Sequence, residues 1–347
     1  MAKIAFFDTK PYDRTSFSRL NERYGFDITW IQGRLSPETA RLAEGHDTVC
    51  AFVNDLLNSD VLGKLYAMGI RLVALRSAGY NNVDLPAAWE KIHVVRVPAY
   101  SPHAVAEHAV ALMLALNRKT HRAYFRIRDN NFAINGLLGF DMYGKTAGII
   151  GTGKIGKTLI GILRGFGMEV IAYDLYPDGE FAASQGVVYT DMETLFRGSD
   201  IISLHCPLTP ENVYMINSKA IGMMKEGVMI INTGRGKLIN TKDLIEGLKS
   251  RKIGSAGLDV YEEETEYFFE DFSQDIISDD VLARLLTFPN VLVTSHQGFF
   301  TKEALLNIAE TTFENIRLFF ERNELPNEVC YKCGEDGCVR KETGKCF

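Results

Sequence analysis

The sequence lacks any apolar stretch long enough to cross a bilayer, and it has no excess of positive charge. Charged residues interrupt its apolar runs well before the roughly 20 residues that a membrane helix needs. The first residues, 1–10, lack the basic and apolar regions of a signal peptide. Lys and Arg number 38 against 44 Asp and Glu, a net charge of −6, which gives no reason to expect nucleic acid as a partner. We therefore expect a cytoplasmic globular protein that binds neither membranes nor nucleic acids.

Cysteine is scarce until the end of the chain. Cys50 and Cys206 lie in apolar, strand-like runs, where buried reduced thiols are expected. The remaining four are Cys330, Cys333, Cys338 and Cys346. Only the first gap of their spacing, C-x2-C-x4-C-x7-C, is usual for a zinc site. We favour a solvated tail without a metal over a zinc site, and a secreted disulfide framework is least favoured.

Strand-like and helix-like segments alternate along most of the chain, which is typical of parallel sheets covered by helices. In the first hundred residues the strand-like runs are KIAFFD, FDITWI, DTVCAFV, RLVALRS and KIHVVRV, and SPETARLAEG between them has the signals of a helix. A second series runs from TAGII to NVLVTSH. We predict an α/β fold with two doubly wound parallel-sheet domains. Residues 1–100 with 300–332 form a flavodoxin-like substrate domain, residues 101–299 a Rossmann NAD domain, and residues 333–347 a cysteine-rich tail.

Residues 101–128 are predicted to form one long helix with apolar residues on more than one side. Such a helix is buried in a core or against a second subunit. We expect the part from Ser101 to Arg122 to form a homodimer contact. We expect its histidines, among them His108, to pack or face solvent rather than bind a metal.

The segment from Ala147 to Asp174 has the order of a dinucleotide-binding unit: strand, glycine turn, helix, strand and carboxylate. Gly151 permits the tight turn, Gly153 lets the backbone approach a pyrophosphate, and Gly156 lets the helix lie close to the strand. The helix N-terminus offers N–H donors to the phosphates. Asp174 can accept from both ribose hydroxyls and would repel a 2′-phosphate, so the sequence predicts NAD rather than NADP.

Three later strand-like runs end in polar residues, at the edge where open α/β sheets bind ligands. Arg235 presents a planar fork that suits a carboxylate substrate. His296 follows the last run, and a carboxylate such as Glu264 beside it would favour its charged form. Together with the coenzyme motif, these residues supply an anchor, a proton donor and its partner for reduction of a 2-oxo acid.

Several motifs together resemble the D-isomer-specific 2-hydroxyacid dehydrogenases, most of all their D-lactate dehydrogenase branch. They are SAGYNNVDL, AVAEHAVALMLALNR, GIIGTGKIG, DIISLHCPLTPEN, INTGRG, AGLDVYEEE and SHQGFFTKEA, and the likeness covers about residues 1–325. The resemblance implies an NAD-dependent oxidoreductase that forms D-lactate from pyruvate and NADH, with His296 as acid/base, Glu264 orienting it and Arg235 binding the substrate carboxylate.

The resemblance also implies the remaining site residues. Coenzyme contacts fall on Gly151, Gly153, Ile155, Gly156, Asp174, Cys206, Pro207, Thr233 and Asp259. Substrate contacts fall on Ser77, Ala78, Gly79, Tyr100, Phe52 and Phe299. Members of the lactate branch often have tyrosine in place of Phe52 and Phe299, so the pocket wall here is more apolar. Bulkier acids, as used by D-2-hydroxyisocaproate or phenyllactate dehydrogenases, are therefore rivals of pyruvate. A binding protein resembling the NAD-sensing corepressors of this fold is the alternative from another class.

Overall fold

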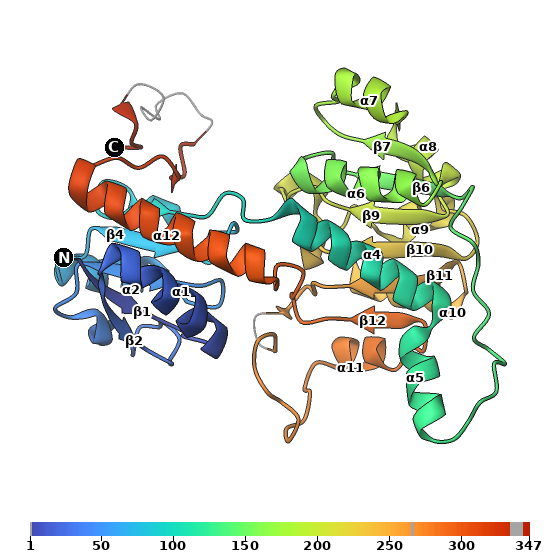
Figure 1. Ribbon diagram of the computed structural model, residues 1–347, viewed down its shortest axis with the longest axis horizontal. Helices are drawn as coiled ribbons and strands as arrows, with labels where there is room; N and C mark the ends of the chain where they lie inside the picture. The colour runs from blue at the N-terminus through green and yellow to red at the C-terminus, as the bar shows by residue number, and fades with distance from the viewer. Residues whose placement is uncertain (1, 265–266, 334–342) are drawn as a thin grey trace. The chain divides into compact units, whose positions relative to one another are not determined.

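The computed structural model describes residues 2–264, 267–333 and 343–347 (Figure 1). The chain divides into two compact units, Met1–Ser101 with Phe300–Phe347, and Pro102–Phe299. Each unit contains one sheet with helices on both faces. The predicted fold class, α/β with two doubly wound domains, is confirmed. None of the helices in the described part of the chain combines the length and apolar character that a membrane span requires.

The sheet of the first unit has the strand order β13-β5-β4-β3-β1-β2. Its strands are β1 (Lys3–Phe6), β2 (Asp27–Trp30), β3 (Thr48–Ala51), β4 (Leu72–Leu75), β5 (His93–Val95) and β13 (Glu328–Val329). The first five are parallel, whereas β13 pairs antiparallel with β5. The parallel strands are the apolar runs of the sequence, because a strand covered on both faces needs apolar side chains on both. The antiparallel edge strand was not predicted.

Helices enclose this sheet from both sides. One face carries α1 (Pro11–Tyr24) and the long α12 (Lys302–Arg322), which lie side by side. Aromatic rings fill the space beneath them, with Phe17 edge-on to both Phe6 and Phe313. The other face carries α2 (Ser59–Ala67), α3 (Leu85–Ala88) and the 3-10 turn η1 (Ala40–Ala43). The C-terminal helix α12 is thus part of the N-terminal unit.

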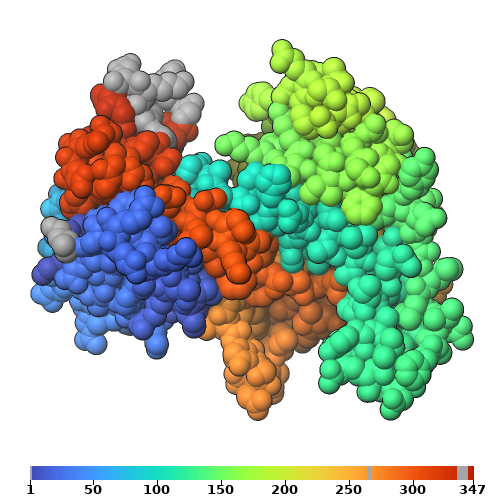
Figure 2. Space-filling model, viewed as in Figure 1, coloured from blue at the N-terminus to red at the C-terminus, as the bar shows by residue number. Residues whose placement is uncertain are grey.

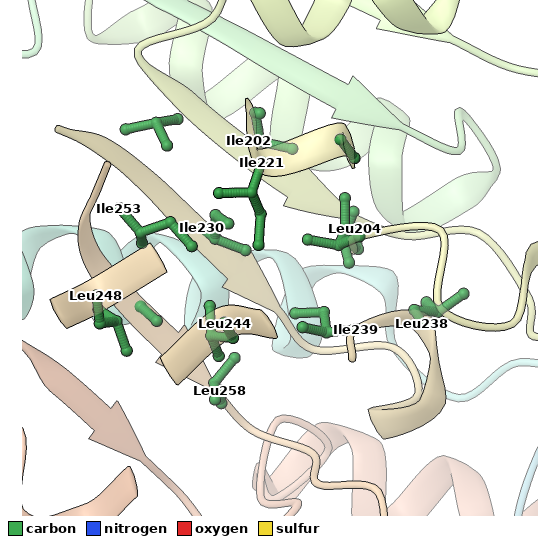
Figure 3. Close-up of a cluster of buried hydrophobic side chains, with 14 of the residues drawn as sticks. Ile202, Leu204, Ile221, Ile230, Leu238, Ile239, Leu244, Leu248, Ile253 and Leu258 are labelled. Atoms are coloured by element: carbon green, nitrogen blue, oxygen red, sulfur yellow. The ribbon is translucent and has the colours of Figure 1, made fainter. Parts of the chain in front are cut away.

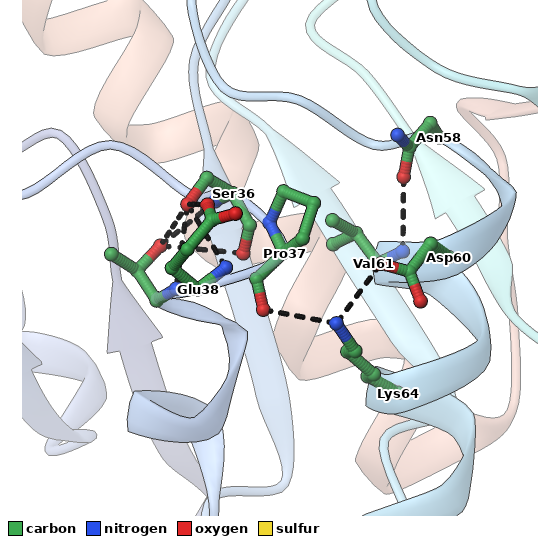
Figure 4. A network of polar contacts seen from close by, with 8 residues as sticks. Ser36, Pro37, Glu38, Asn58, Asp60, Val61 and Lys64 are labelled. Atoms are coloured by element: carbon green, nitrogen blue, oxygen red, sulfur yellow. Dashed lines mark hydrogen bonds and ion pairs between the residues drawn. The ribbon is translucent and has the colours of Figure 1, made fainter.

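The segment 36–45, predicted as a helix, forms only η1. Its side chains hydrogen-bond to nearby backbone groups instead: the Thr39 hydroxyl accepts from the Ser36 N–H at 2.8 Å and donates to the Arg34 carbonyl at 2.6 Å. Such local bonds compete with the helical ladder. Figure 4 shows the network around Ser36 beside the start of α2, where the Asn58 side chain caps the helix by accepting from the Val61 N–H.

The sheet of the second unit is parallel throughout, with the order β12-β11-β10-β9-β6-β7-β8. Its strands are β6 (Thr146–Ile150), β7 (Glu169–Tyr173), β8 (Val188–Tyr189), β9 (Ile201–Leu204), β10 (Val228–Asn232), β11 (Ile253–Leu258) and β12 (Val291–Val293). Each predicted strand of this series is present. The order reverses between β6 and β9, and the loops after these strands therefore meet at the switch point where such sheets bind ligands.

Two apolar layers cover this sheet. On one face lie α4 (Pro102–Arg118) and α6 (Lys154–Gly165). The other face carries α8 (Met192–Gly198), α9 (Ser218–Met223), α10 (Thr241–Lys249) and α11 (Asp280–Leu286). Figure 3 shows this second layer, in which Ile202 and Ile230 of the sheet meet Ile221 of α9 and Leu244 of α10.

The long helix predicted for residues 101–128 is two helices. It breaks at Lys119, whose φ of 50° is left-handed, and continues as α5 (Thr120–Arg128). The buried apolar side chains of α4 pack within their own unit, against α6 and the sheet. The exposed apolar side chains follow α4 instead, on α5 and on the segment after it, which Figure 2 shows at the molecular surface. They are Tyr124, Phe125, Ile127, Phe132, Ile134 and Leu138.

Candidate active site

The glycine turn after β6 is built as a cradle. Gly151 has a φ of 95°, and a Cβ there would lie 2.5 Å from the Cys206 amide nitrogen. A Cβ on Gly156 would lie 2.1 Å from the Gly151 carbonyl oxygen, so this residue lets α6 begin close to the strand. A Cβ on Gly153, by contrast, would have no neighbouring atom of the described residues within 4 Å. The space at Gly153, where α6 begins, suits the phosphates of a dinucleotide. The side chain of Ile155 packs partly against the core, so only its backbone is available to such a ligand.

Asp174 follows β7 and is held as an anion. Its Oδ2 accepts from the Thr152 N–H at 2.6 Å and from the Thr152 hydroxyl at 2.9 Å, and its Oδ1 accepts from the Tyr176 N–H at 2.9 Å. Burial opposes the charged form, but these hydrogen bonds outweigh it and lower the pKa of Asp174. Thr152, which receives a further hydrogen bond from the Tyr189 hydroxyl at 2.8 Å, is a supporting residue that the sequence analysis missed.

Three further predicted coenzyme residues lie at the ends of β9 and β10. Asn212 donates to the Pro207 carbonyl at 2.7 Å and contacts the Cys206 sulfur at 3.9 Å, and burial raises the pKa of the Cys206 thiol to about 11. The Thr233 hydroxyl is buried and has no hydrogen-bond partner among the described residues. An orphaned buried hydroxyl is costly unless a ligand satisfies it. Together with the open space at Gly153, it fits a bound NAD.

Arg235 lies in the loop after β10, and its position depends on two close contacts. Its backbone carbonyl accepts from the Asn232 side chain at 2.9 Å, and its guanidinium donates to the Gly234 carbonyl at 2.7 Å. The next residue, Gly236, lies so close to the loop after β11 that a Cβ would be 2.1 Å from the Tyr261 carbonyl carbon. The loop of Arg235 is thus packed against the loop that leads to Glu264.

Glu264 and His296, which the family resemblance pairs, are in direct hydrogen-bonding contact. The His296 Nδ1 is 2.9 Å from the Glu264 Oε1, while the Glu264 Oε2 accepts from the Tyr261 N–H at 3.0 Å. His296 has a φ of 49°, and its N–H donates to the Asp259 carbonyl at 2.8 Å. Because Nδ1 is occupied by the carboxylate, Nε2 is the ring atom left for a substrate proton.

Asp259 fixes the loop that carries His296. The side chain is 1% exposed, and its oxygens accept from the Thr294 hydroxyl at 2.5 Å and from the Gln297 and Gly298 N–H groups at 2.9 and 2.8 Å. His108 of α4 approaches the same carboxylate at 3.2 Å. Burial opposes ionisation of Asp259, but the hydrogen bonds prevail and its pKa is lowered. Asp259 was predicted as a coenzyme contact, whereas its positioning of this loop, together with His108 and Thr294, was not predicted.

In the first unit, the predicted carboxylate-binding segment follows β4. The Ser77 hydroxyl donates to the Gly79 carbonyl at 2.8 Å, and Arg96 donates to the Ala78 carbonyl at 2.8 Å. The carbonyls are thus engaged, whereas within the described part of the chain the N–H groups of these three residues donate to no acceptor. This arrangement suits an anion.

Three aromatic residues complete the predicted set. Phe52 is buried beside Arg76, whose guanidinium lies 4.8 Å from the ring centre. The Tyr100 carbonyl accepts from the Asn307 side chain at 2.6 Å. In the second unit, Phe299 is buried, 6.4 Å from the ring of Phe269.

Comparison with known proteins identifies the family to which the chain belongs. The model of the D-isomer specific 2-hydroxyacid dehydrogenase NAD binding domain matches residues 110–298. A D-lactate dehydrogenase of Escherichia coli is 52% identical over 328 residues, covering 94% of this chain and 99% of that protein. The apo structure of D-lactate dehydrogenase from Escherichia coli has a TM-score of 0.87 at 50% identity, with coverage of 94% and 99%. A D-2-hydroxyisocaproate dehydrogenase structure has a TM-score of 0.83 at 31% identity, with the same coverage.

Proposed function

Because the chain belongs to the family of D-isomer specific 2-hydroxyacid dehydrogenases and is an NAD-dependent oxidoreductase, we propose that it reduces pyruvate to D-lactate. The observation that carries the proposal is the ion pair of His296 and Glu264, on the same sheet edge as Arg235 and the dinucleotide cradle. The D-lactate dehydrogenases of Escherichia coli and Salmonella are 50–53% identical to this chain. The D-2-hydroxyisocaproate dehydrogenase is 31% identical, within the range of 27–33% that three other D-lactate dehydrogenases have.

Each of the residues Arg235, His296 and Glu264 has a separate role in the proposed reaction. NADH, when bound at the glycine turn and Asp174, would supply a hydride for C2 of the 2-oxo acid and leave as NAD. Arg235 binds the substrate carboxylate with its fork of N–H donors and, through its charge, polarises the neighbouring carbonyl. His296 donates a proton from Nε2 to the carbonyl oxygen, and Glu264 stabilises the imidazolium before that transfer. In the reverse direction, the neutral imidazole takes the hydroxyl proton back.

Substrate preference is tested by following NADH absorbance with pyruvate, phenylpyruvate and 2-oxoisocaproate. We expect the highest kcat/KM with pyruvate, and we expect D-lactate but not L-lactate to reduce NAD. The buried rings of Phe52 and Phe299 favour one second candidate, a dehydrogenase of bulkier apolar acids. A higher kcat/KM with phenylpyruvate or 2-oxoisocaproate would establish that candidate. Binding of NADH without turnover of any of the three would instead indicate a corepressor-like binding protein.

We also infer a homodimer and a cytoplasmic location. The exposed apolar side chains on α5 and the segment after it, including Phe125 and Phe132, support a subunit contact on the second unit. Sedimentation velocity tests this contact: we expect a dimer for the parent and a shift toward monomer for Phe125→Asp, with Asp129→Asn as a nearby control. A monomeric parent would contradict the contact. Cell fractionation tests the location.

A further inference from the structure

Three cysteines of the last 18 residues meet beside the edge strand β13. Cys330 follows the strand directly, Cys333 is three residues later, and Cys346 is next to the end of the chain. The Cys330 and Cys333 sulfurs are 3.6 Å apart, those of Cys333 and Cys346 are 3.8 Å apart, and all three lie within 4.8 Å of one another. Cys330 is 6% exposed and Cys346 is 0% exposed, so these two are not solvated as the sequence analysis favoured, whereas Cys333 is exposed. Cys338 lies outside the described residues.

The spacing of the sulfurs fits a tetrahedral metal ion. Zinc–thiolate bonds of about 2.3 Å at the tetrahedral angle place neighbouring sulfurs about 3.8 Å apart. A disulfide needs only two sulfurs, at about 2 Å, and none of the five described cysteines is paired in this way with another. Here three sulfurs, and not two, lie within 4.8 Å of one another, as the ligands of a single metal ion would. Thiolate ligands suit a soft ion such as zinc and not magnesium or calcium, which take oxygen ligands.

The turn between the first two cysteines is already shaped for ligation. The Cys333 N–H donates to the Cys330 carbonyl at 3.2 Å, which closes the C-x2-C segment. The Cys330 N–H points back and donates to the Cys333 sulfur at 3.3 Å. These two hydrogen bonds hold the sulfurs of Cys330 and Cys333 close together, 3.6 Å apart.

The third cysteine is anchored separately, by residues of the sheet edge. The Cys346 N–H donates to the carboxylate of Glu328 in β13, and the other oxygen of that carboxylate is 2.5 Å from the His93 Nδ1. The Phe347 ring stacks on the His93 ring, with centres 4.3 Å apart and planes 10° from parallel. Cys330 at β13 and Cys346 on Glu328 are therefore each held by the sheet edge at the place where the sulfurs meet.

We propose that Cys330, Cys333 and Cys346 bind a zinc ion that fastens the C-terminal segment to the β5–β13 edge of the first unit. Each thiol gives up its proton to solvent and donates an electron pair to Zn²⁺, so no oxidation or reduction takes place. Three thiolates leave one of the four zinc positions for a further ligand. The site is structural and does not depend on the proposed reaction, since none of its residues belongs to the catalytic set.

The full-length protein, produced with zinc in the medium, tests the proposal by elemental analysis. We expect about one zinc per chain, and its loss in Cys330→Ser, Cys333→Ser and Cys346→Ser. Lys332→Ser, between two of the ligands, is the matched control and keeps the metal. Cobalt in place of zinc should give intense thiolate-to-metal charge-transfer absorption, which the three serine variants lose and the control retains.

A second measurement on the unaltered protein avoids dependence on folding of the variants. A chromogenic chelator should release the zinc while thiol titration gains about three reactive groups per chain. Protein that contains no zinc after reduction and incubation with the metal would overturn the proposal. So would zinc that persists in all three serine variants, or thiols that titrate equally with and without the chelator.

Discussion

Gly236→Ala tests whether close packing of two loops positions the catalytic residues. The added Cβ would lie 2.1 Å from the Tyr261 carbonyl carbon and oxygen and 2.5 Å from the Glu262 amide nitrogen. Non-bonded carbon contacts are ordinarily about 3.5 Å or longer. The loops after β10 and β11 must therefore separate by roughly 1.4 Å, because backbone atoms cannot rotate away as a side chain can.

The displacement separates Arg235 from the ion pair of Glu264 and His296. A misplacement of about 1 Å can cost about 100-fold in rate, and we expect kcat/KM with pyruvate to fall by that order. Overpacking also costs about 1–3 kcal/mol of the free energy of unfolding, which corresponds to a Tm lower by roughly 2–12 °C. The NADH Kd should change by less than about threefold, because Gly153 and Asp174 lie on other strand ends.

Gly234→Ala is the matched control. Its Cβ would be 3.5 Å from the nearest atoms, on the side chains of Asn232 and Leu238, which is ordinary contact. We expect its kcat/KM to remain within about threefold of the parent. Steady-state kinetics, NADH titration and thermal melts on the three proteins measure these quantities. Parent-like kinetics for Gly236→Ala would refute the reasoning, as would equal losses in both variants.

Three further substitutions test single residues. Arg235→Lys keeps the charge but loses the bidentate fork, so we expect kcat/KM to fall by about 100-fold or more while NADH binding is retained; near-normal kinetics would remove Arg235 from the site. Asp174→Ser removes the ribose acceptor, and NADH titration should show a Kd raised about tenfold or more with weaker discrimination against NADPH. Since the pKa of Asp174 is lowered, the parent should bind NADH with unchanged affinity as the pH falls to about 5. Asp259→Asn should lower the free energy of unfolding by about 1.5–3 kcal/mol. The pKa of Asp259 is depressed in the fold, so this stabilisation is present above the ordinary carboxyl pKa of about 4 and is lost as the pH falls through the lowered value. The difference in Tm between parent and variant should be constant from pH 8 to 5 and shrink in acid; a constant difference throughout would show that ionisation of Asp259 is irrelevant.

The parallel strands could be predicted because burial on both faces forces continuous apolar runs, as in β3 and β9. The glycine turn was predictable for a related reason: backbone crowding at Gly151 and Gly156 leaves room only for glycine. Local patterns failed where side chains compete with the backbone. The Thr39 hydroxyl hydrogen-bonds to the backbone at Ser36 and Arg34, so the segment forms only a short 3-10 turn in place of the predicted helix.

At the candidate site, contacts between residues far apart in the sequence could not be predicted from local patterns. Nothing near His108 in the sequence indicates that it approaches Asp259, because helical spacing beside alanine and leucine is equally typical of simple packing. The same holds for the cysteines: the spacing indicates Cys330 and Cys333 as a pair, whereas the position of Cys346 depends on Glu328 and His93 of the sheet edge. Such meetings depend on the whole fold and not on any local pattern.

The two-residue strand β13 also affects behaviour in concentrated solution. Without it, β5 would be the outermost strand and would present open hydrogen-bonding groups, which recruit other chains and seed aggregates. Glu328 and Val329 occupy those groups opposite Val95 and Val94. The strand β13 thus protects the sheet edge against self-association, and a truncation before Glu328 should lower solubility before it lowers activity.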